Sequence, residues 1–294
     1  MRLLKYFLVF IFLMITSRAN AQDCLDYCPK EKYCLTNSFV RTVQTISGVN
    51  IVTSKIVAKI IKKSILKYAK GDIKVKVSSF SMADAKQGKF KRIIVNGKNV
   101  NIYSINISEI VAKTKCDWLH VDLKKSPIGL KEPVAADFSA KFSAEDLNNI
   151  LKSVTYQKYF LSIKMNSQKL NILEISQPEI SLKDDKFQLL SRVKVPLMGS
   201  FKVKIVSDLK IYNNKIITDD LSILVDNMLL KVKSSKYFID ILNPLWFAQE
   251  LLQEYDCKIL LKNVKISNEM VNINGSFFLS KSKENKWYEV FLSF

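Results

Sequence analysis

Lys and Arg number 46 against 27 Asp and Glu in this chain of 294 residues, so its formal net charge is +19 at pH 7, and 48% of the residues are hydrophobic. Such a balance favours anionic partners, namely lipid headgroups, nucleic acid or acidic glycans, although a solubility function or a lysine-rich genome also accounts for it. The chain has one histidine and 7 glycines, without either glycine-rich nucleotide motif. This excludes a histidine-rich metal site and nucleotide binding through those loops.

The first 21 residues are typical of an export signal. Arg2 and Lys5 form a positive start, an apolar run follows over residues 6–15, and Ala19-Asn20-Ala21 fits the small-x-small cleavage rule. Cleavage after Ala21 removes three cations and lowers the net charge from +19 to +16. The run is short for a membrane-spanning helix, and an uncleaved anchor is the alternative. We expect an exported protein, periplasmic or associated with the cell envelope, that is not integral to the membrane after cleavage.

Export and the scarcity of arginine argue against nucleic acid as the partner, because arginine is the preferred reader of phosphates and bases. Phospholipid or an anionic membrane surface remains as the expected partner. A protein partner is not identified by the sequence.

Five cysteines follow the predicted cleavage site: Cys24, Cys28, Cys34, Cys116 and Cys257. An oxidising compartment allows them to form disulfides. The first three are close enough for a small N-terminal loop, and Cys116 and Cys257 could pair across the fold, but sequence does not fix the pairing. A zinc site is the alternative for the N-terminal cluster, and it lacks a nearby fourth ligand. We expect no metal and no cofactor.

Three segments are predicted: a signal peptide over residues 1–21, a cysteine-containing lead-in over 22–48, and one domain over 49–294. The domain opens with a helix over 50–70, because apolar residues recur there at spacings of three and four and Gly71 is a typical helix end. Lysines cover much of its remaining surface. Such a helix either packs on a core with a solvated lysine face or lies at a membrane surface.

After Gly71 the hydrophobic period becomes two, which predicts strands. Asn96-Gly97 and Asn213-Asn214 are expected hairpin turns, Ser143 is an expected N-cap of a second helix, and Pro244 is expected to interrupt a later one. The predicted strands are 73–80, 90–95, 100–107, 118–123, 160–165, 170–176, 179–182, 187–195, 199–212, 215–225, 258–266, 270–280 and one from Trp287.

Strands in runs with few helices predict an α+β fold. We expect a mostly antiparallel, strongly curled sheet, elongated or partly barrel-like, packed around one or two long amphipathic helices. A sheet that curls around a helix can leave an apolar groove or tube.

Catalytic constellations are scarce. His120 lies in a strand-like run without a nucleophile elbow, so a Ser-His-Asp engine is not supported. The paired carboxylates are Glu145-Asp146 at a helix start, Asp184-Asp185 in a turn, and Asp219-Asp220 in a strand, where adjacent side chains point to opposite faces. We expect no enzyme; a carbohydrate-active enzyme would need two carboxylates converging in a cleft.

Several motifs resemble the DUF2993, or LmeA-like, phospholipid-binding proteins. They are Gly71–Val77, Phe80–Phe90, Ile94–Ile102, Phe142–Asn148, Asn243-Pro244-Leu245 and Val264–Gly275, within about Asn50 to Leu279. The resemblance implies an elongated lipid-binding fold akin to tubular lipid-binding domains, and a role in envelope lipid handling without a catalytic site. The cysteine cluster and the high lysine content depart from the family pattern.

We therefore expect a protein that binds phospholipid acyl chains in an apolar groove, in lipid transport or envelope maintenance. The groove candidates are Ile56, Ile60, Ile61, Ile65, Val75 and Val77. The headgroup or membrane-surface candidates are Lys62, Lys63, Lys67, Trp246 and Phe247, and for the two aromatic residues a position in an ordinary core is the favoured alternative. The alternative function is a non-catalytic structural or interaction protein of the envelope with a filled core.

Overall fold

The computed structural model describes residue 28 and the ranges 49–124, 129–158, 160, 174–230, 243–253 and 257–279. The predicted signal peptide, most of the lead-in, and the predicted strands over 170–173 and from Trp287 lie outside these residues. Residues 154–158 and 160 are helical, so the strand predicted to start at Phe160 is wrong at its first residue.

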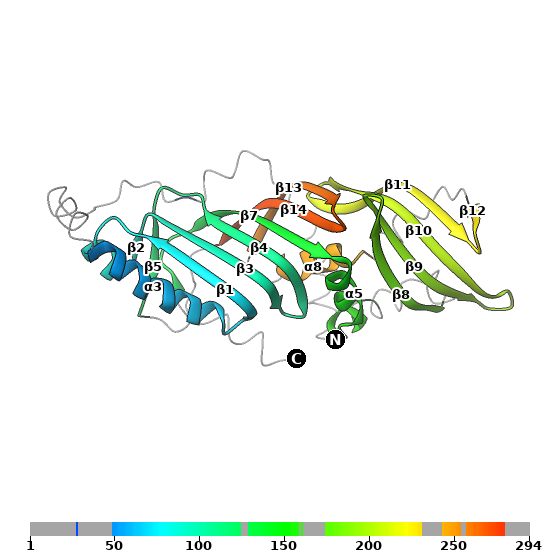
Figure 1. The fold of residues 1–294 in the computed structure, drawn as a ribbon, viewed down its shortest axis with the longest axis horizontal. Helices are drawn as coiled ribbons and strands as arrows, with labels where there is room; N and C mark the ends of the chain where they lie inside the picture. Colours follow the sequence, from blue (N-terminus) through cyan, green and yellow to red (C-terminus); the bar gives the residue numbers. More distant parts are fainter. Residues whose placement is uncertain are drawn as a thin grey trace, which may run out of the picture.

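The described part combines antiparallel sheets with a few helices, which confirms the predicted α+β class (Figure 1). The helices are α3 (Val49–Ile65), α4 (Met82–Lys86), α5 (Ala144–Lys152) and α8 (Pro244–Gln253). The first strands are β1 (Ala69–Ser78), β2 (Lys89–Phe90), β3 (Arg92–Ile102), β4 (Ile105–Thr114), β5 (Leu119–Asp122), β6 (Gly129–Leu130) and β7 (Val134–Ser143). The later ones are β8 (Glu174–Lys183), β9 (Lys186–Val195), β10 (Gly199–Tyr212), β11 (Lys215–Val225), β12 (Met228–Leu230), β13 (Cys257–Ser267) and β14 (Met270–Leu279).

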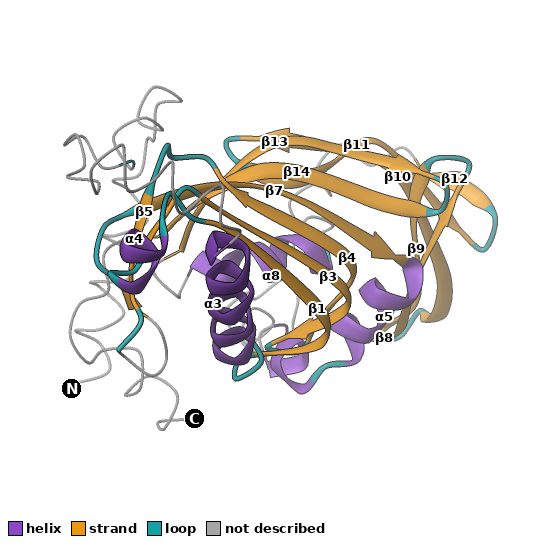
Figure 2. Cartoon of the chain, turned by 60° about the vertical axis from the view of Figure 1, so that its left-hand side comes forward, coloured by secondary structure: helices purple, strands orange, loops and turns teal. Residues whose placement is uncertain are grey.

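Two large sheets follow one another along the length of the molecule (Figure 1). The six-stranded sheet has the order β1-β3-β4-β7-β14-β13, and the five-stranded sheet has the order β12-β11-β10-β9-β8. A small third sheet, β2-β5-β6, lies near α3 and α4 (Figure 2). Every described pair of strands is antiparallel.

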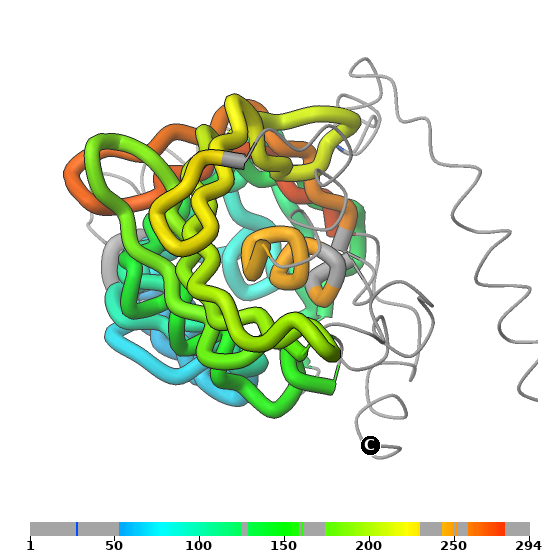
Figure 3. Tube along the Cα trace, turned by 90° about the vertical axis from the view of Figure 1, so that its right-hand side faces the viewer, coloured from blue at the N-terminus to red at the C-terminus, as the bar shows by residue number. Residues whose placement is uncertain are grey.

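The two large sheets share one core. Its buried residues come from β4, β7 and β14 of the six-stranded sheet, from β8 to β11 of the five-stranded sheet, and from α5 and α8 between them. Figure 3 looks along the molecule and shows α8 surrounded by strands. In the shared core, the ring of Phe247 packs edge to face against the ring of Tyr156, with the ring centroids 5.3 Å apart.

Two asparagines cover sheet edges where the sheets meet. Asn148 of α5 donates to the carbonyl oxygen of Ile180 at 2.8 Å and accepts from its N–H at 2.7 Å. Asn214, in the turn between β10 and β11, donates to Ile259 O at 2.6 Å and accepts from Leu261 N at 2.7 Å. Because β8 and β13 are edge strands of their sheets, each amide supplies backbone pairing that a neighbouring strand would otherwise provide.

The predicted strongly curled sheet around one or two long helices is not found. Among the described strands no sheet closes or curls strongly: β1 and β13 are the free edges of one, and β12 and β8 those of the other. The helix α3 has 17 residues and lies beside β1 (Figure 2), and α5 and α8 have only 9 and 10. The physical reason is that the chain leaves the first sheet after β7, builds a second sheet from β8 to β12, and then returns with β13 and β14, so the apolar faces of two sheets share one core.

Glycine and proline were the main sources of local error. Helix α3 ends at Ile65, not at Gly71, which lies inside β1. Asn96-Gly97 is not a turn: Gly97 is buried in β3, where a Cβ would lie 2.5 Å from Val100 Cγ2, so close packing explains it. Pro244 starts α8, where its missing N–H is harmless; the part of the predicted helix before Asn243 lies outside the described residues.

Candidate functional site

One face of the five-stranded sheet is apolar beyond the region that the core covers. Nearest the core, four isoleucine and leucine side chains stand opposite one another across four strands and are all buried: Ile180, Leu189, Ile205 and Ile223. Side chains alternate between the faces of a strand. Residues two and four positions farther along therefore stay on this same face.

The same face continues with five more apolar residues, of which Ile175, Val203 and Val225 still pack against the shared core, whereas Val193 and Phe201 lie beyond it. Val203 stands opposite Val225, and Val193 stands opposite both Phe201 and Ile175. All five are half-buried. We call this set the distal apolar face: Ile175, Val193, Phe201, Val203 and Val225. Its apolar area lies at the end of the molecule opposite α3 (Figure 1).

The other face of the same strands is polar and cationic. Arg192 and Lys194 of β9 and Lys202 and Lys204 of β10 occupy the alternate positions, and Lys194 pairs with Glu174 at 3.3 Å. Ion pairs this exposed contribute little to stability. The distal sheet is thus a two-sided surface, apolar within and basic outside.

The predicted groove residues around α3 do not all share one place. Ile61, Ile65, Val75 and Val77 pack in a cluster with buried Phe90 and with residues of β5. By contrast, Ile56 and Ile60 are exposed, with 55% and 42% of their surface accessible. The structure therefore brings four of the six candidates together as packing partners and places two on the outer side of the helix. That any of them contacts an acyl chain stays a prediction.

The predicted membrane-surface residues divide in the same way. Lys63 and Lys67 are exposed and Lys62 is half-buried on α3 and the turn after it. Phe247 is buried in the shared core, and Trp246 lies under Lys215, whose Nζ is 4.7 Å from the ring centroid. Of the two aromatic residues, Phe247 is therefore an ordinary core residue, buried among the described residues.

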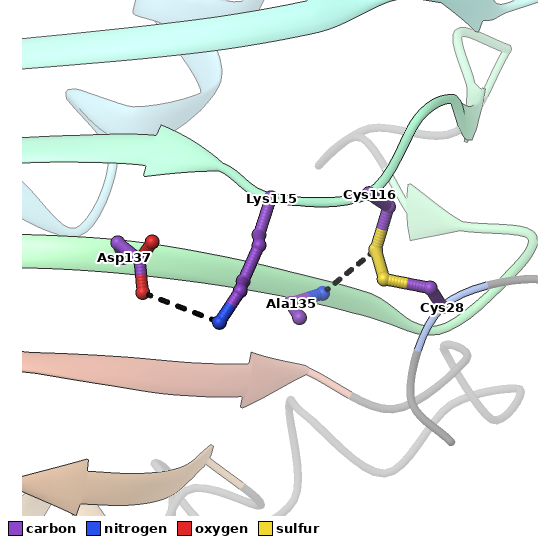
Figure 4. Close-up of a disulfide and its surroundings, with 5 residues drawn as sticks. All are labelled: Cys28, Lys115, Cys116, Ala135 and Asp137. Atoms are coloured by element: carbon purple, nitrogen blue, oxygen red, sulfur yellow. Dashed lines mark hydrogen bonds and ion pairs between the residues drawn. A yellow bond between two sulfur atoms is a disulfide. The ribbon is translucent and has the colours of Figure 1, made fainter. Parts of the chain in front are cut away.

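A disulfide joins Cys28 of the lead-in to Cys116, with the two Cα atoms 5.4 Å apart (Figure 4). Of the pairings that the sequence left open, the one between Cys116 and Cys257 is therefore not formed. Cys116 lies after β4, where its sulfur accepts a hydrogen bond from Ala135 N at 3.4 Å, whereas Cys257 opens β13, and β7 and β14 lie between β4 and β13 in the sheet. Cys24 and Cys34 lie outside the described residues.

Asp137 lies near this disulfide and makes the densest polar cluster of the six-stranded sheet. It accepts from Ser276 Oγ at 2.6 Å and Lys262 Nζ at 2.8 Å, and Lys115 Nζ is 4.0 Å away. Burial opposes ionisation of this carboxyl, but the hydrogen bonds and the lysine charges outweigh burial and lower the pKa of Asp137. The cluster ties β7, β13 and β14 together.

The candidate catalytic groups are accounted for by structural contacts. His120 lies in β5 and hydrogen bonds the carbonyl oxygen of Gln87 at 3.1 Å. Burial and the charge of Lys131 lower its pKa.

The acidic pairs serve a helix start, a turn and ion pairs. Asp146 forms a capping box with Ser143, which confirms the predicted helix start. Asp184 and Asp185 both have positive φ, 54° and 55°, in the predicted turn. Asp208 and Asp220 share Lys186, at 2.8 Å and 3.4 Å, on an exposed strand face, which is a surface ion-pair network and not a pair of carboxylates in a cleft.

Within the described ranges, no group of three or more His, Cys, Asp or Glu side chains could hold a metal ion. In the same part of the chain, no helix combines the length and apolar character needed to cross a bilayer. Comparison with protein-family models, curated proteins and solved structures gives no significant match. The site is therefore argued from the chain's own residues.

Sequence reasoning missed the distal apolar face as a site. Its signal is the alternation Val193-x-Val195 and Phe201-x-Val203 on either side of Pro196-Leu197-Met198-Gly199. This pattern was used to predict strands, and it also marks an apolar face on both sides of an apolar turn. The missing information was how far the core extends along that face.

Proposed function

We propose that the protein is an exported lipid-binding protein of the cell envelope, which holds phospholipid acyl chains on the distal apolar face, in lipid transport or envelope maintenance. The observation that carries this proposal is the continuation of the apolar face past the buried row of Leu189 and Ile205 to half-buried Val193 and Phe201. Apolar area of this kind is stabilised when a ligand removes it from water.

The chemistry of an acyl chain suits this face. Each methylene that leaves water contributes about 0.8 kcal/mol, so ten methylenes contribute roughly 8 kcal/mol before the chain is ordered. The face is mostly Val, Ile and Phe. Its polar side chain opposite Val203 is Ser191, whose Oγ already donates to Ser176 O at 3.0 Å, so this hydroxyl is poorly placed to select a polar ligand. The motif resemblance to LmeA-like proteins supports the same class of ligand.

The exposed side of α3 has a separate role in this proposal. Lys63 and Lys67 lie at the opposite end of the molecule from the distal apolar face (Figure 1), so they do not contact the headgroup of a lipid held there. Together with half-buried Lys62 they would attract an anionic surface, each worth about 1 kcal/mol near such lipids.

A tryptophan scan of β10 tests the ligand site. Phe201 points to the distal apolar face and its neighbour Ser200 points to the basic face. Phe201→Trp protein loaded with brominated phospholipid, and freed of vesicles, is expected to lose emission relative to the same variant loaded with unbrominated phospholipid, whereas Ser200→Trp is not. Equal quenching at both positions would contradict an acyl chain on this face. So would delipidated protein that takes up no phospholipid from liposomes.

The alternative is a non-catalytic structural or interaction protein of the envelope with a filled core. It is favoured by the cluster in which Phe90 packs with the predicted groove residues Ile61, Ile65, Val75 and Val77. The side chains of Phe90 and Ile61 are 0% and 8% exposed. Native mass spectrometry of the exported protein separates the two functions. Phospholipid at fixed stoichiometry supports the first, and an apo mass that persists after incubation with liposomes supports the second.

A further inference from the structure

The turn between β9 and β10 breaks the pattern of the other hairpin turns. Met198 N donates to Val195 O at 3.2 Å and closes a four-residue turn with Pro196 and Leu197 at its centre. Leu197 has a φ of 67°. A turn with proline second and positive φ third is of the type II kind, and that third position favours Gly or Asn, because a Cβ there is strained.

Other described turns place polar residues in this strained conformation. The positive-φ pairs at the remaining tips of the five-stranded sheet and at the β13–β14 turn are Asp184-Asp185, Asn213-Asn214, Asp226-Asn227 and Asn268-Glu269. Among the described residues with positive φ, Leu197 is the one aliphatic side chain. Its position therefore departs from the rule that the same chain follows elsewhere.

Leu197 is also the most exposed large hydrophobic side chain of the described residues, with a relative exposure of 108%, and the next residue in the chain, Met198, is 70% exposed. Nothing lies within 4 Å of a Cβ built on the next residue, Gly199, so the tip projects into open space. A leucine that is both strained and fully hydrated stabilises nothing in the isolated molecule. It gains only when something takes it out of water.

A second apolar turn lies at the same end of the sheet. Met228 and Leu229, at the start of β12, are 68% and 62% exposed. Asp226, just before them, binds the backbone of Lys202 in β10: its Oδ1 accepts from Lys202 N at 3.0 Å, and its N donates to Lys202 O at 2.9 Å. These contacts hold the β11–β12 turn beside β10, at the end of the molecule that carries the β9–β10 turn (Figure 1).

Cations flank the apolar tip. Arg192 and Lys194 precede the turn, and Lys202 and Lys204 follow it, on the basic face of the same two strands. Short apolar side chains beyond a ring of lysine and arginine match a bilayer interface, in which the apolar groups enter the acyl region and the cations remain with anionic headgroups. A protein groove would instead require a shaped patch of larger area.

We propose that Pro196-Leu197-Met198, with Met228 in the neighbouring turn at the same end of the sheet, is a membrane-insertion tip, through which the distal end of the molecule docks on a bilayer containing anionic phospholipid. The proposal deepens the lipid-binding function, because docking here places the distal apolar face next to the membrane. It does not require that function, since insertion of the tip needs no bound lipid.

Two double variants of the full mature protein test the tip. Leu197→Asn/Met198→Ser removes both apolar side chains and gives the strained position a residue that tolerates it. Val154→Ser/Tyr212→Ser removes two other exposed apolar side chains, which are 71% and 61% exposed, away from the tip. Each is sedimented with vesicles of phosphatidylcholine and phosphatidylglycerol in equal parts.

The tip variant is expected to lose about tenfold or more in vesicle partitioning, because two aliphatic side chains no longer leave water, and the control variant is expected to stay within about twofold. The midpoint of thermal unfolding of the tip variant is expected to be unchanged or higher. If the turn had only a structural role, the substitutions would not weaken vesicle binding while leaving the unfolding midpoint unchanged or raising it.

Several results would overturn the proposal. They are unchanged partitioning of the tip variant, equal loss in both variants, no binding of the wild type to these vesicles, and loss only when Ile56 and Ile60 of α3 are changed to serine. A wild-type oligomer that the tip variant abolishes would assign the tip to self-association instead. Native mass spectrometry of the tip variant reads the lipid load separately, so failure of the tip and failure of the proposed function are distinguishable.

Discussion

Replacing Cys28 and Cys116 by alanine removes the crosslink between the lead-in and the six-stranded sheet. The bridge closes a loop with a sequence separation of 88. For a loop of this length the chain-entropy relation gives a stabilisation of about 4.6 kcal/mol at 25 °C, because the crosslink restricts the unfolded chain. Alanine also fits the buried site of Cys116 beside Ala135 and Phe278, so the substitution itself adds little to this value.

Urea unfolding of the mature protein measures the effect. We expect the oxidised wild type to exceed the double variant by about 3–5 kcal/mol in the free energy of unfolding, and reductant to lower the wild type to the level of the variant. Cys257→Ala is the matched control, because the bridge joins Cys28 to Cys116 and remains intact in it.

The same material tests the pairing directly. Peptide mapping without reduction is expected to recover a Cys28–Cys116 linkage. A peptide that links Cys116 to Cys257, or a loss of stability below about 1 kcal/mol in the double variant, would refute the reasoning. A native disulfide would also support export, since such bonds persist in oxidising compartments.

Three further predictions concern stability. Asn214→Gly keeps the left-handed turn but leaves two backbone groups of β13 without their partner, so we expect a loss of about 2 kcal/mol in urea unfolding, whereas Asn213→Gly, at the exposed neighbouring position, should change it by less than about 0.5 kcal/mol. Gly88→Ala places a Cβ 1.9 Å from a backbone oxygen of β5 at a φ of +81°, and we expect a loss of more than about 1 kcal/mol in the same assay. Burial and the charge of Lys131 lower the pKa of His120 in the folded state. The free energy of unfolding should therefore be constant above roughly pH 6.5 and fall as the pH drops below that value. If the free energy of unfolding of His120→Gln falls with pH as steeply as that of the wild type, His120 is not the cause.

The strands of the five-stranded sheet were the most predictable part of the fold. The limits predicted for β10 and β11, Gly199–Tyr212 and Lys215–Val225, are those of the structure. Their residues alternate between apolar and polar, and Asn213-Asn214 supplies two residues that tolerate positive φ. Local chemistry and the tertiary fold agree there, so short-range pattern was sufficient.

The first hairpin of the six-stranded sheet was misplaced for a physical reason. Tyr103 and Ser104 make the turn, with φ of 49° and 70°, although neither is a residue that typically adopts positive φ. The stronger signal, Asn96-Gly97, lies inside β3 because Gly97 is where Ile110 and Val100 approach the backbone. A glycine that is needed for packing and one that is needed for a turn look alike in sequence.

Long-range geometry was the part that sequence could not supply. The pairing of Cys28 with Cys116 depends on where the lead-in crosses the sheet, and the outward position of Ile56 and Ile60 depends on which side of α3 meets β1. Both groups of residues carried the correct chemistry, a thiol in an exported chain and an apolar side chain on an amphipathic helix. Their neighbours were set by the tertiary fold.

Leu197 shows how a failure of local rules can point to function. The other turns of its sheet agree at every level: polar, tolerant of positive φ, and exposed. At position 197 the positive φ favours Gly or Asn, and full exposure to solvent favours a polar side chain. The residue there is nevertheless leucine, and it is followed by a methionine that is 70% exposed. Natural sequences accept such conflicts mainly at functional sites. Because the strain and the exposed area both disappear if the side chain is exchanged, a higher unfolding midpoint with weaker docking in the tip variant would identify function as the cause.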